Sequence, residues 1–256
     1  MSRIAQAFQN GKAFIGFITG GDPSIAKTKE FVLEMIRAGA DLIEIGIPFS
    51  DPIAEGPVIQ EANIRALRGG ATVKKIFALV EDLRKETAVP LVFLTYFNPV
   101  FHYGLDAFFE CAASAGLDGI IIPDLPFEEQ APVREAAGKH GIDLITLIAP
   151  TTEARIQEIA ASASGFIYIV SSMGVTGVRA EITTDLDSIV KSLRQVTKTP
   201  AAIGFGIHTP AQAAQMAKIA DGVIVGSAIV KIIAEHGESA GPYIYEYVRE
   251  MKGAMG

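Results

Sequence analysis

The chain has 256 residues, of which 49% are hydrophobic and 20% are charged. This composition builds a large packed core and argues against a disordered protein. The formal net charge of −7 argues against a nucleic-acid or membrane-surface partner, since both kinds of partner favour basic patches.

The N-terminal segment, residues 1–12, has no apolar stretch that ends in a small-residue cleavage site, so we expect no signal peptide. No apolar run approaches the roughly 20 residues that a membrane-spanning helix needs. Cys111 is the single cysteine, which excludes an internal disulfide and a multi-thiolate metal site. We therefore expect a cytoplasmic protein in which Cys111 is a small core residue.

Short apolar runs alternate with longer amphipathic segments along the chain, and near-continuous apolar runs indicate strands that are covered on both faces. The predicted strands are residues 13–19, 42–46, 91–96, 119–122, 144–148, 166–170, 201–205 and 222–225. The predicted helices are residues 25–38, 73–86, 106–114, 128–140, 153–161, 186–196 and 210–219. Because no composition break marks a second domain, we predict one domain over residues 1–256.

Strands that alternate with helices are typical of parallel β/α units in an α/β protein. Eight repeats favour a single eight-fold β/α (TIM) barrel, with an N-terminal helix and extra short helices. An open doubly wound sheet is the alternative, but no Gly-x-Gly-x-x-Gly fingerprint follows the first predicted strand. Barrel enzymes place their chemistry at the C-terminal ends of the strands, so we expect the site residues there.

Glu44 lies within a short strand that is otherwise suited to burial. Side chains alternate along a strand, so Ile43 and Ile45 share one face while Leu42 and Glu44 share the other. If the isoleucines face the helices, Glu44 points into the barrel near its upper rim. A carboxylate buried there has a raised pKa, which suits a group that gives and takes a proton. A structural carboxylate bonded to backbone amides is the alternative interpretation.

Other acids lie at or near the predicted strand ends. Asp51 and Glu55 belong to the proline- and glycine-containing loop 47–57, where a carboxylate can accept a hydrogen bond from a substrate N–H. Spacing alone favours solvated surface roles for both. Asp124 follows the fourth predicted strand, and for Asp22 we expect helix capping.

Glycine-rich segments follow the last three predicted strands, at residues 174–177, 204–206 and 226–227. Glycine lets backbone amides approach an anion, and Ser227 is expected to open a short helix, residues 228–234, whose N-terminus favours negative charge. Loops after strands seven and eight plus such a helix form the recurrent phosphate site of these barrels. The sequence therefore predicts a phosphorylated small-molecule substrate.

No lysine stands at a predicted strand end, so a Schiff base is not expected. The four histidines are scattered without metal-ligand spacing, and we expect no metal site. From the residues alone, the prediction is acid/base chemistry on a phosphate ester.

Beyond these patterns, the chain closely resembles tryptophan synthase α subunits along essentially its whole length. The segments that carry the resemblance are LIEIGIPFSDPIAEGPVIQ at 42–60, FITGGDP at 17–23, YFNPV at 96–100, DLP at 124–126, GVTG at 174–177, GFGI at 204–207 and GSAIV at 226–230. The resemblance implies retro-aldol cleavage of indole-3-glycerol phosphate to indole and glyceraldehyde 3-phosphate. It implies no cofactor in this chain and a pyridoxal-phosphate β subunit as partner in an α2β2 complex, which receives indole through a channel.

The resemblance also implies roles for individual residues. Glu44 matches the catalytic glutamate, and Glu55 matches the second acid, which engages the indole N–H. Residues matching the indole pocket are Phe17, Leu94, Tyr96 and Phe205. Residues matching the phosphate site are Gly177, Gly206, Gly226 and Ser227. Thr176 matches a residue of the mobile loop, and Asp51 and Pro52 match the partner-contact surface.

Glu55 departs from the family pattern, in which the second acid is aspartate. The added methylene moves the carboxylate by about an ångström, and misplacements of that size cost on the order of 100-fold in rate. Three alternatives stay open: a stand-alone indole-3-glycerol-phosphate lyase, a β-activating subunit whose catalysis is weakened by Glu55, and a barrel isomerase or epimerase acting on a sugar phosphate.

Overall fold

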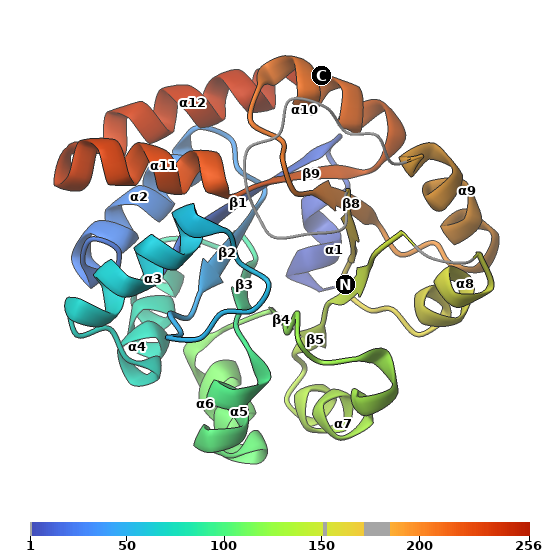
Figure 1. Cartoon of the computed structure of the whole chain (residues 1–256), viewed down its shortest axis with the longest axis horizontal. Coiled ribbons are helices and arrows are strands. Elements are labelled where there is room, and N and C mark those ends of the chain that lie inside the picture. Colours follow the sequence, from blue (N-terminus) through green and yellow to red (C-terminus); the bar gives the residue numbers. More distant parts are fainter. Residues whose placement is uncertain (1, 151–152, 172–184) are drawn as a thin grey trace.

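The computed structural model describes residues 2–150, 153–171 and 185–256. Its strands are all paired in parallel. They are β1 (Ala13–Thr19), β2 (Leu42–Gly46), β3 (Leu91–Leu94), β4 (Gly119–Ile121), β5 (Asp143–Leu144), β6 (Thr146–Ile148), β7 (Ile167–Val170), β8 (Ala201–Gly204) and β9 (Gly222–Val225). In Figure 1 the helices surround this sheet.

The sheet closes on itself at the fifth predicted strand. The order of the strands is β5-β4-β3-β2-β1-β9-β8-β7-β6, so the two strands at its ends, β5 and β6, are neighbours in the chain. Only Ile145 separates them, and its amide bonds the carbonyl of Ile120 in β4. The predicted single strand is therefore divided where it changes partner from β4 to β7. The eight-fold β/α barrel is confirmed.

The described helices are more numerous than predicted. They are α1 (Arg3–Ala7), α2 (Ile25–Arg37), α3 (Pro57–Arg68), α4 (Val73–Arg84), α5 (Phe97–Tyr103), α6 (Leu105–Ala115), α7 (Ala131–Lys139), α8 (Glu153–Ala161), α9 (Leu186–Val196), α10 (Pro210–Ile219), α11 (Ser227–His236) and α12 (Gly241–Ala254). Helices α3, α5 and α12 were not predicted as separate elements. Among the described residues, no helix has the length and apolar character to cross a bilayer.

The two largest hydrophobic clusters of the described residues lie between the strands and the helices and inside the barrel, and a smaller one joins Phe17 to α3 and α11. Ile43 and Ile45 belong to the outer cluster, whereas Leu42 belongs to the inner one, as the alternation along β2 predicts. Helix α1 contributes Ile4 to the inner cluster and lies near the middle of the ring in Figure 1. The barrel interior on which the site rests is therefore apolar.

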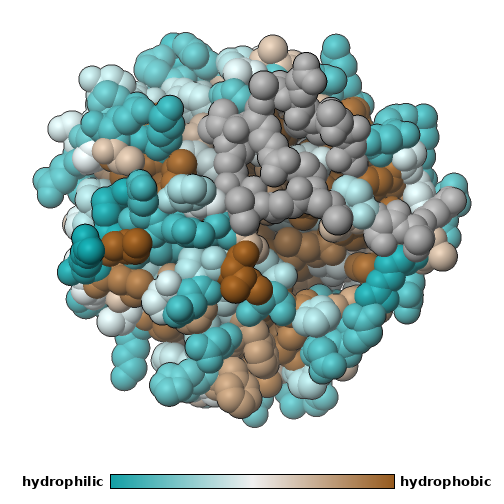
Figure 2. Space-filling view, in the orientation of Figure 1, coloured by the Kyte–Doolittle hydropathy of each residue, from teal (hydrophilic) through white to brown (hydrophobic). Residues whose placement is uncertain are grey.

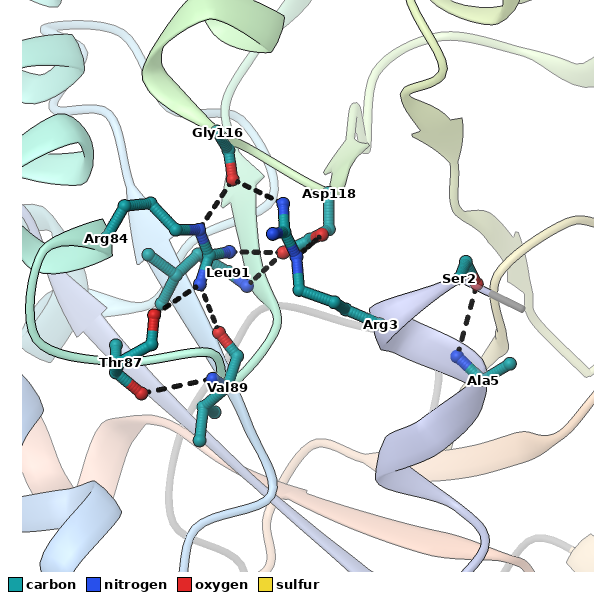
Figure 3. A network of polar contacts seen from close by, with 9 residues as sticks. All are labelled: Ser2, Arg3, Ala5, Arg84, Thr87, Val89, Leu91, Gly116 and Asp118. Atoms are coloured by element: carbon teal, nitrogen blue, oxygen red, sulfur yellow. Dashed lines mark hydrogen bonds and ion pairs between the residues drawn. The ribbon is translucent and has the colours of Figure 1, made fainter.

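A network of polar contacts centred on Asp118 fixes the N-terminal ends of the strands (Figure 3). The carboxylate of Asp118 accepts hydrogen bonds from Arg3 Nε at 2.6 Å, from the Leu91 amide at 2.8 Å and from Arg84. Both arginines also donate to the carbonyl of Gly116. The network joins α1, α4, β3 and β4 at one end of the barrel.

Candidate active site

A cavity lies at the other end of the barrel, at the C-terminal ends of the strands. The residues that line it come from the strand ends and the loops that follow them. They are Phe17, Glu44, Ala54, Glu55, Ile59, Leu94, Pro123, Leu147, Tyr168, Phe205, Gly206, Ile207, Ile224, Gly226, Ser227 and Ala228. Figure 2 shows hydrophobic side chains gathered near the centre of the molecular face and hydrophilic ones around much of its periphery.

Glu44 faces the interior of the barrel and is 1% exposed. In the sheet it is flanked by Phe17 of β1 and Val92 of β3. Its Oε1 atom has no hydrogen-bond partner among the described residues. Burial, and then the negative charge of Glu55, raises the pKa of Glu44 from 4.5 to about 8. A carboxyl group with this pKa is mostly protonated at neutral pH.

Glu55 reaches the same cavity from the loop between β2 and α3, and it is 5% exposed. Two hydrogen bonds fix this loop. The Ala54 amide donates to the Tyr96 hydroxyl at 3.0 Å, and Gln60 Nε2 donates to the Glu55 carbonyl at 2.7 Å. Burial, and then the charge of Glu55, raises the pKa of Tyr96. The loop thus holds a second buried carboxylate beside Glu44.

Three of the four residues matched to an indole pocket, Phe17, Leu94 and Phe205, line the cavity. A Cβ atom at Gly46 would lie 2.8 Å from the Phe17 ring, so this position of β2 needs glycine to admit the ring. Tyr96 differs: among the described residues it is not part of the lining, and its hydroxyl instead holds the loop that carries Glu55.

Tyr168 is a cavity residue that the sequence reasoning missed. It lies in β7, and its ring packs edge-on against Phe205 with the centroids 6.0 Å apart. A Cβ atom at Gly204 would overlap the Tyr168 ring, so glycine is needed there as well. Burial, and then the charges of Glu44 and Glu55, raises the pKa of Tyr168 well above its ordinary value. Its position was predictable, because alternation places Tyr168 on the same face as Phe166 of the inner cluster.

One part of the cavity lining is suited to an anion. Gly206, Gly226 and Ser227 line it, and α11 begins at Ser227 as expected, although it extends beyond the predicted 228–234. Its first turn has no acidic residue, and no side chain caps its first amides among the described residues. Free amides at a helix N-terminus attract negative charge. Gly177 and Thr176 lie outside the described residues.

The remaining acids have other surroundings. Asp51 is exposed and Pro52 is half-buried. Asp124 accepts a hydrogen bond from the Phe97 amide at 2.9 Å at the start of α5. The prediction for Asp22 was wrong: Ser24 caps α2, and buried Asp22 pairs with Arg65. Within the described ranges, no group of three His, Cys, Asp or Glu side chains has the arrangement of a metal site.

Comparison with known proteins agrees with this geometry. The family model "Tryptophan synthase alpha chain" matches residues 4–255. The tryptophan synthase alpha chain of Lacticaseibacillus casei is 51% identical over 255 residues, covering 100% of this chain and 96% of its own length. The alpha chain of Legionella pneumophila superimposes with a TM-score of 0.89 at 35% identity, covering 100% of this chain and 97% of that one. A chain of the α2β2 tryptophan synthase complex of the hyperthermophile Pyrococcus furiosus gives a TM-score of 0.87 at 35% identity. The match covers 95% of this chain and 99% of that one. The chain belongs to the tryptophan synthase alpha chain family.

Proposed function

We propose that this chain cleaves indole-3-glycerol phosphate to indole and glyceraldehyde 3-phosphate, a carbon–carbon lyase reaction, as the α subunit of a tryptophan synthase. The observation that carries the proposal is the state of Glu44. It is a buried carboxyl group with a pKa raised to about 8 and an unpartnered Oε1 atom, and it lines a cavity between an aromatic wall and an uncapped helix N-terminus.

In this proposal Glu44 carries both proton transfers. The neutral carboxyl group protonates the indole carbon that bears the glycerol chain, and the ring becomes an iminium. The resulting carboxylate removes the proton of the adjacent glycerol hydroxyl. The electrons of that O–H bond form the aldehyde carbonyl, and those of the carbon–carbon bond return to the ring, which releases indole. One group serves both steps because its pKa lies near neutral pH.

Other parts of the cavity hold the substrate. The Glu55 carboxylate accepts a hydrogen bond from the indole N–H. Its negative charge stabilises the positively charged ring that protonation creates. Phe17, Leu94 and Phe205 bury the ring, while the amides of Gly206, Gly226 and Ser227 bind the phosphate at the start of α11. We assign Gly177 to the phosphate and Thr176 to closure over the site on sequence resemblance alone. No cofactor takes part in this chain.

A β subunit is the proposed partner, and it supplies pyridoxal phosphate for the use of indole. Ile53 supports this assignment, because it is 75% exposed directly after Asp51 and Pro52, the residues matched to the partner contact. An exposed large apolar side chain in a loop is suited to burial in an interface. We also propose a single domain over residues 1–256 and a location in the cytoplasm.

An indole-release assay with purified chain tests the proposal. Glu44→Gln is expected to abolish cleavage, and Glu61→Gln, the same change at an exposed position of α3, should leave it unaltered. Retained turnover in Glu44→Gln contradicts the assignment of Glu44. Absence of indole release by the wild-type chain, with and without a β subunit, favours an isomerase or epimerase.

The same assay with a tryptophan synthase β subunit separates the remaining alternatives. We expect complex formation by size exclusion and faster indole release. Turnover that does not respond, with no complex, favours a stand-alone lyase. Activation of the β subunit without cleavage, together with recovery of cleavage in Glu55→Asp, favours a subunit whose catalysis is weakened by Glu55.

A further inference from the structure

The backbone at Phe205 is strained. Its φ of 74° makes it the only non-glycine residue with a positive φ in the described part of the chain. Bulky side chains rarely adopt this conformation, and it persists only where the surroundings enforce it. Phe205 follows β8, its ring lines the cavity, and Gly206 continues the turn with a φ of 78°.

Ser171 holds the strained turn from the side of β7. Its hydroxyl donates a hydrogen bond to the Phe205 carbonyl at 2.6 Å, and its amide donates to the Gly204 carbonyl at 3.1 Å. Ser171 is 1% exposed and comes directly after β7, so its position is set by the barrel itself. The hydroxyl therefore joins two neighbouring strand ends at the point of strain.

A second set of hydrogen bonds holds the turn from the outside. His208 Nδ1 donates to the Gly206 carbonyl at 2.9 Å, and the Tyr247 hydroxyl of α12 donates to the His208 carbonyl at 3.0 Å. The Gln212 side chain, which also forms the capping box of α10 with Thr209, accepts a hydrogen bond from the His208 amide at 3.0 Å. The end of the turn is thus fixed to two outer helices, and Ser171 fixes its beginning from the side of β7.

We propose that Ser171 is a positioning residue for the substrate phosphate and ring, an assignment that rests on the proposed function. In a trans peptide the Gly206 N–H points opposite to the Phe205 carbonyl. The Ser171 hydrogen bond that directs this carbonyl toward β7 therefore also sets the direction of the Gly206 amide. It selects the backbone conformation that places the Phe205 ring in the cavity wall. One hydroxyl thus orients both ends of the substrate.

The first test compares Ser171→Ala with Ser192→Ala, which removes a buried hydroxyl of α9 that has no hydrogen-bond partner among the described residues. We expect Ser171→Ala to weaken the affinity for inorganic phosphate, and to raise KM for indole-3-glycerol phosphate, by about tenfold, with kcat changed less. Ser171→Thr, which keeps the hydroxyl, should restore both values. Ser171→Cys keeps the side-chain size with a weak donor and should behave like alanine. A phosphate affinity of Ser171→Ala or Ser171→Cys within about twofold of that of Ser192→Ala overturns the proposal.

A thermodynamic cycle with Phe205→Gly gives a second test, since glycine adopts a positive φ without strain. In this background Ser171→Ala should weaken phosphate binding less than it does in the wild-type chain. Equal losses in both backgrounds contradict the role of Ser171 in holding the strain. Phosphate titration does not depend on turnover, so a wild-type chain that binds phosphate and releases no indole refutes the proposed function and leaves the test of Ser171 intact.

Discussion

Arg65 donates two parallel hydrogen bonds to the buried carboxylate of Asp22, from Nε to Oδ1 at 2.9 Å and from Nη2 to Oδ2 at 2.7 Å. The Asp22 side chain is 1% exposed. The pair joins the loop after β1 to α3, the helix that begins directly after the Glu55 loop. Because the guanidinium matches the carboxylate in two places, lysine cannot replace this arginine.

Replacing Arg65 by leucine is expected to lower the free energy of unfolding by about 3 kcal/mol, because it leaves the Asp22 carboxylate buried without its partner. Arg68→Leu makes the same chemical change at an exposed position of the same helix and should have a much smaller effect. Denaturant unfolding of both variants measures the difference. Equal losses of unfolding free energy in the two variants would show that the Arg65–Asp22 pair stabilises the fold no more than an exposed arginine does.

The pKa of Glu44 is expected to appear in the pH dependence of cleavage. Because the free enzyme must hold a proton on Glu44, kcat/KM should fall above about pH 8. Glu55→Gln removes the neighbouring negative charge and should move this inflection to lower pH. The measurement is the rate of indole release from low substrate concentrations across the pH range. A profile that stays flat well above pH 8 contradicts the assignment.

Folding should depend on pH through the same group. The pKa of Glu44 is about 8 in the folded protein and near 4.5 in the unfolded chain. Between these values the folded state retains a proton that the unfolded state has lost, so the free energy of unfolding falls as the pH rises through this window. Glu44→Gln removes this dependence. Denaturant curves at several pH values should show the variant gaining stability relative to the wild type up to about pH 8; a constant difference would disprove the linkage.

Asp118 is expected to contribute to stability and not to substrate binding. Asp118→Ala leaves Arg84 buried without its partner and should cost about 3 to 5 kcal/mol of unfolding free energy. KM should be unchanged, since the network lies at the end of the barrel opposite to the cavity. Asp82→Ala removes a more accessible ion pair, with Lys29 on the helical surface, and is the matched control, with a much smaller expected loss. Similar melting temperatures for the two variants would count against the network.

Tyr96→Phe removes the hydroxyl that accepts a hydrogen bond from the Ala54 amide, and so it loosens the loop that carries Glu55. We expect kcat to fall by about tenfold, because displacement of a positioned group costs rate more than stability. Tyr243→Phe, at an exposed position of α12, is the control. Steady-state kinetics and thermal unfolding of both variants give the result. A kcat equal to that of the control would remove Tyr96 from the set of positioning residues.

Local sequence patterns predicted the parts of the fold that local physics determines. The strands 13–19, 42–46 and 222–225 have their predicted bounds, since an apolar run covered on both faces is itself the signal. Helices α3 and α12 were missed because their prolines resemble loop residues. Pro57 and Pro242 instead occupy the first turn of each helix, where proline costs no hydrogen bond.

The site, too, has features that local sequence predicts and contacts that it does not predict. Alternation along β2 predicted the direction of Glu44, because a strand has only two faces. The partner of Asp22 is 43 residues away, and the partner of Ser171 is 34 residues away. Contacts of this kind depend on which strand ends become neighbours after closure. A sequence pattern identifies the strands but does not reveal which polar atoms meet across them.

The last helix, α12, packs against α2 and α10, and Lys252 bonds both the Asp41 carboxylate and the Lys12 carbonyl near β1. Part of the layer around the first strand is therefore made by residues some two hundred positions later in the chain. During synthesis, the first strands and helices of the barrel leave the ribosome long before α12 has been made. The face of α2 that contacts α12 stays open until this helix has been synthesised, and a nascent chain with such an open face is prone to aggregate and to need chaperones.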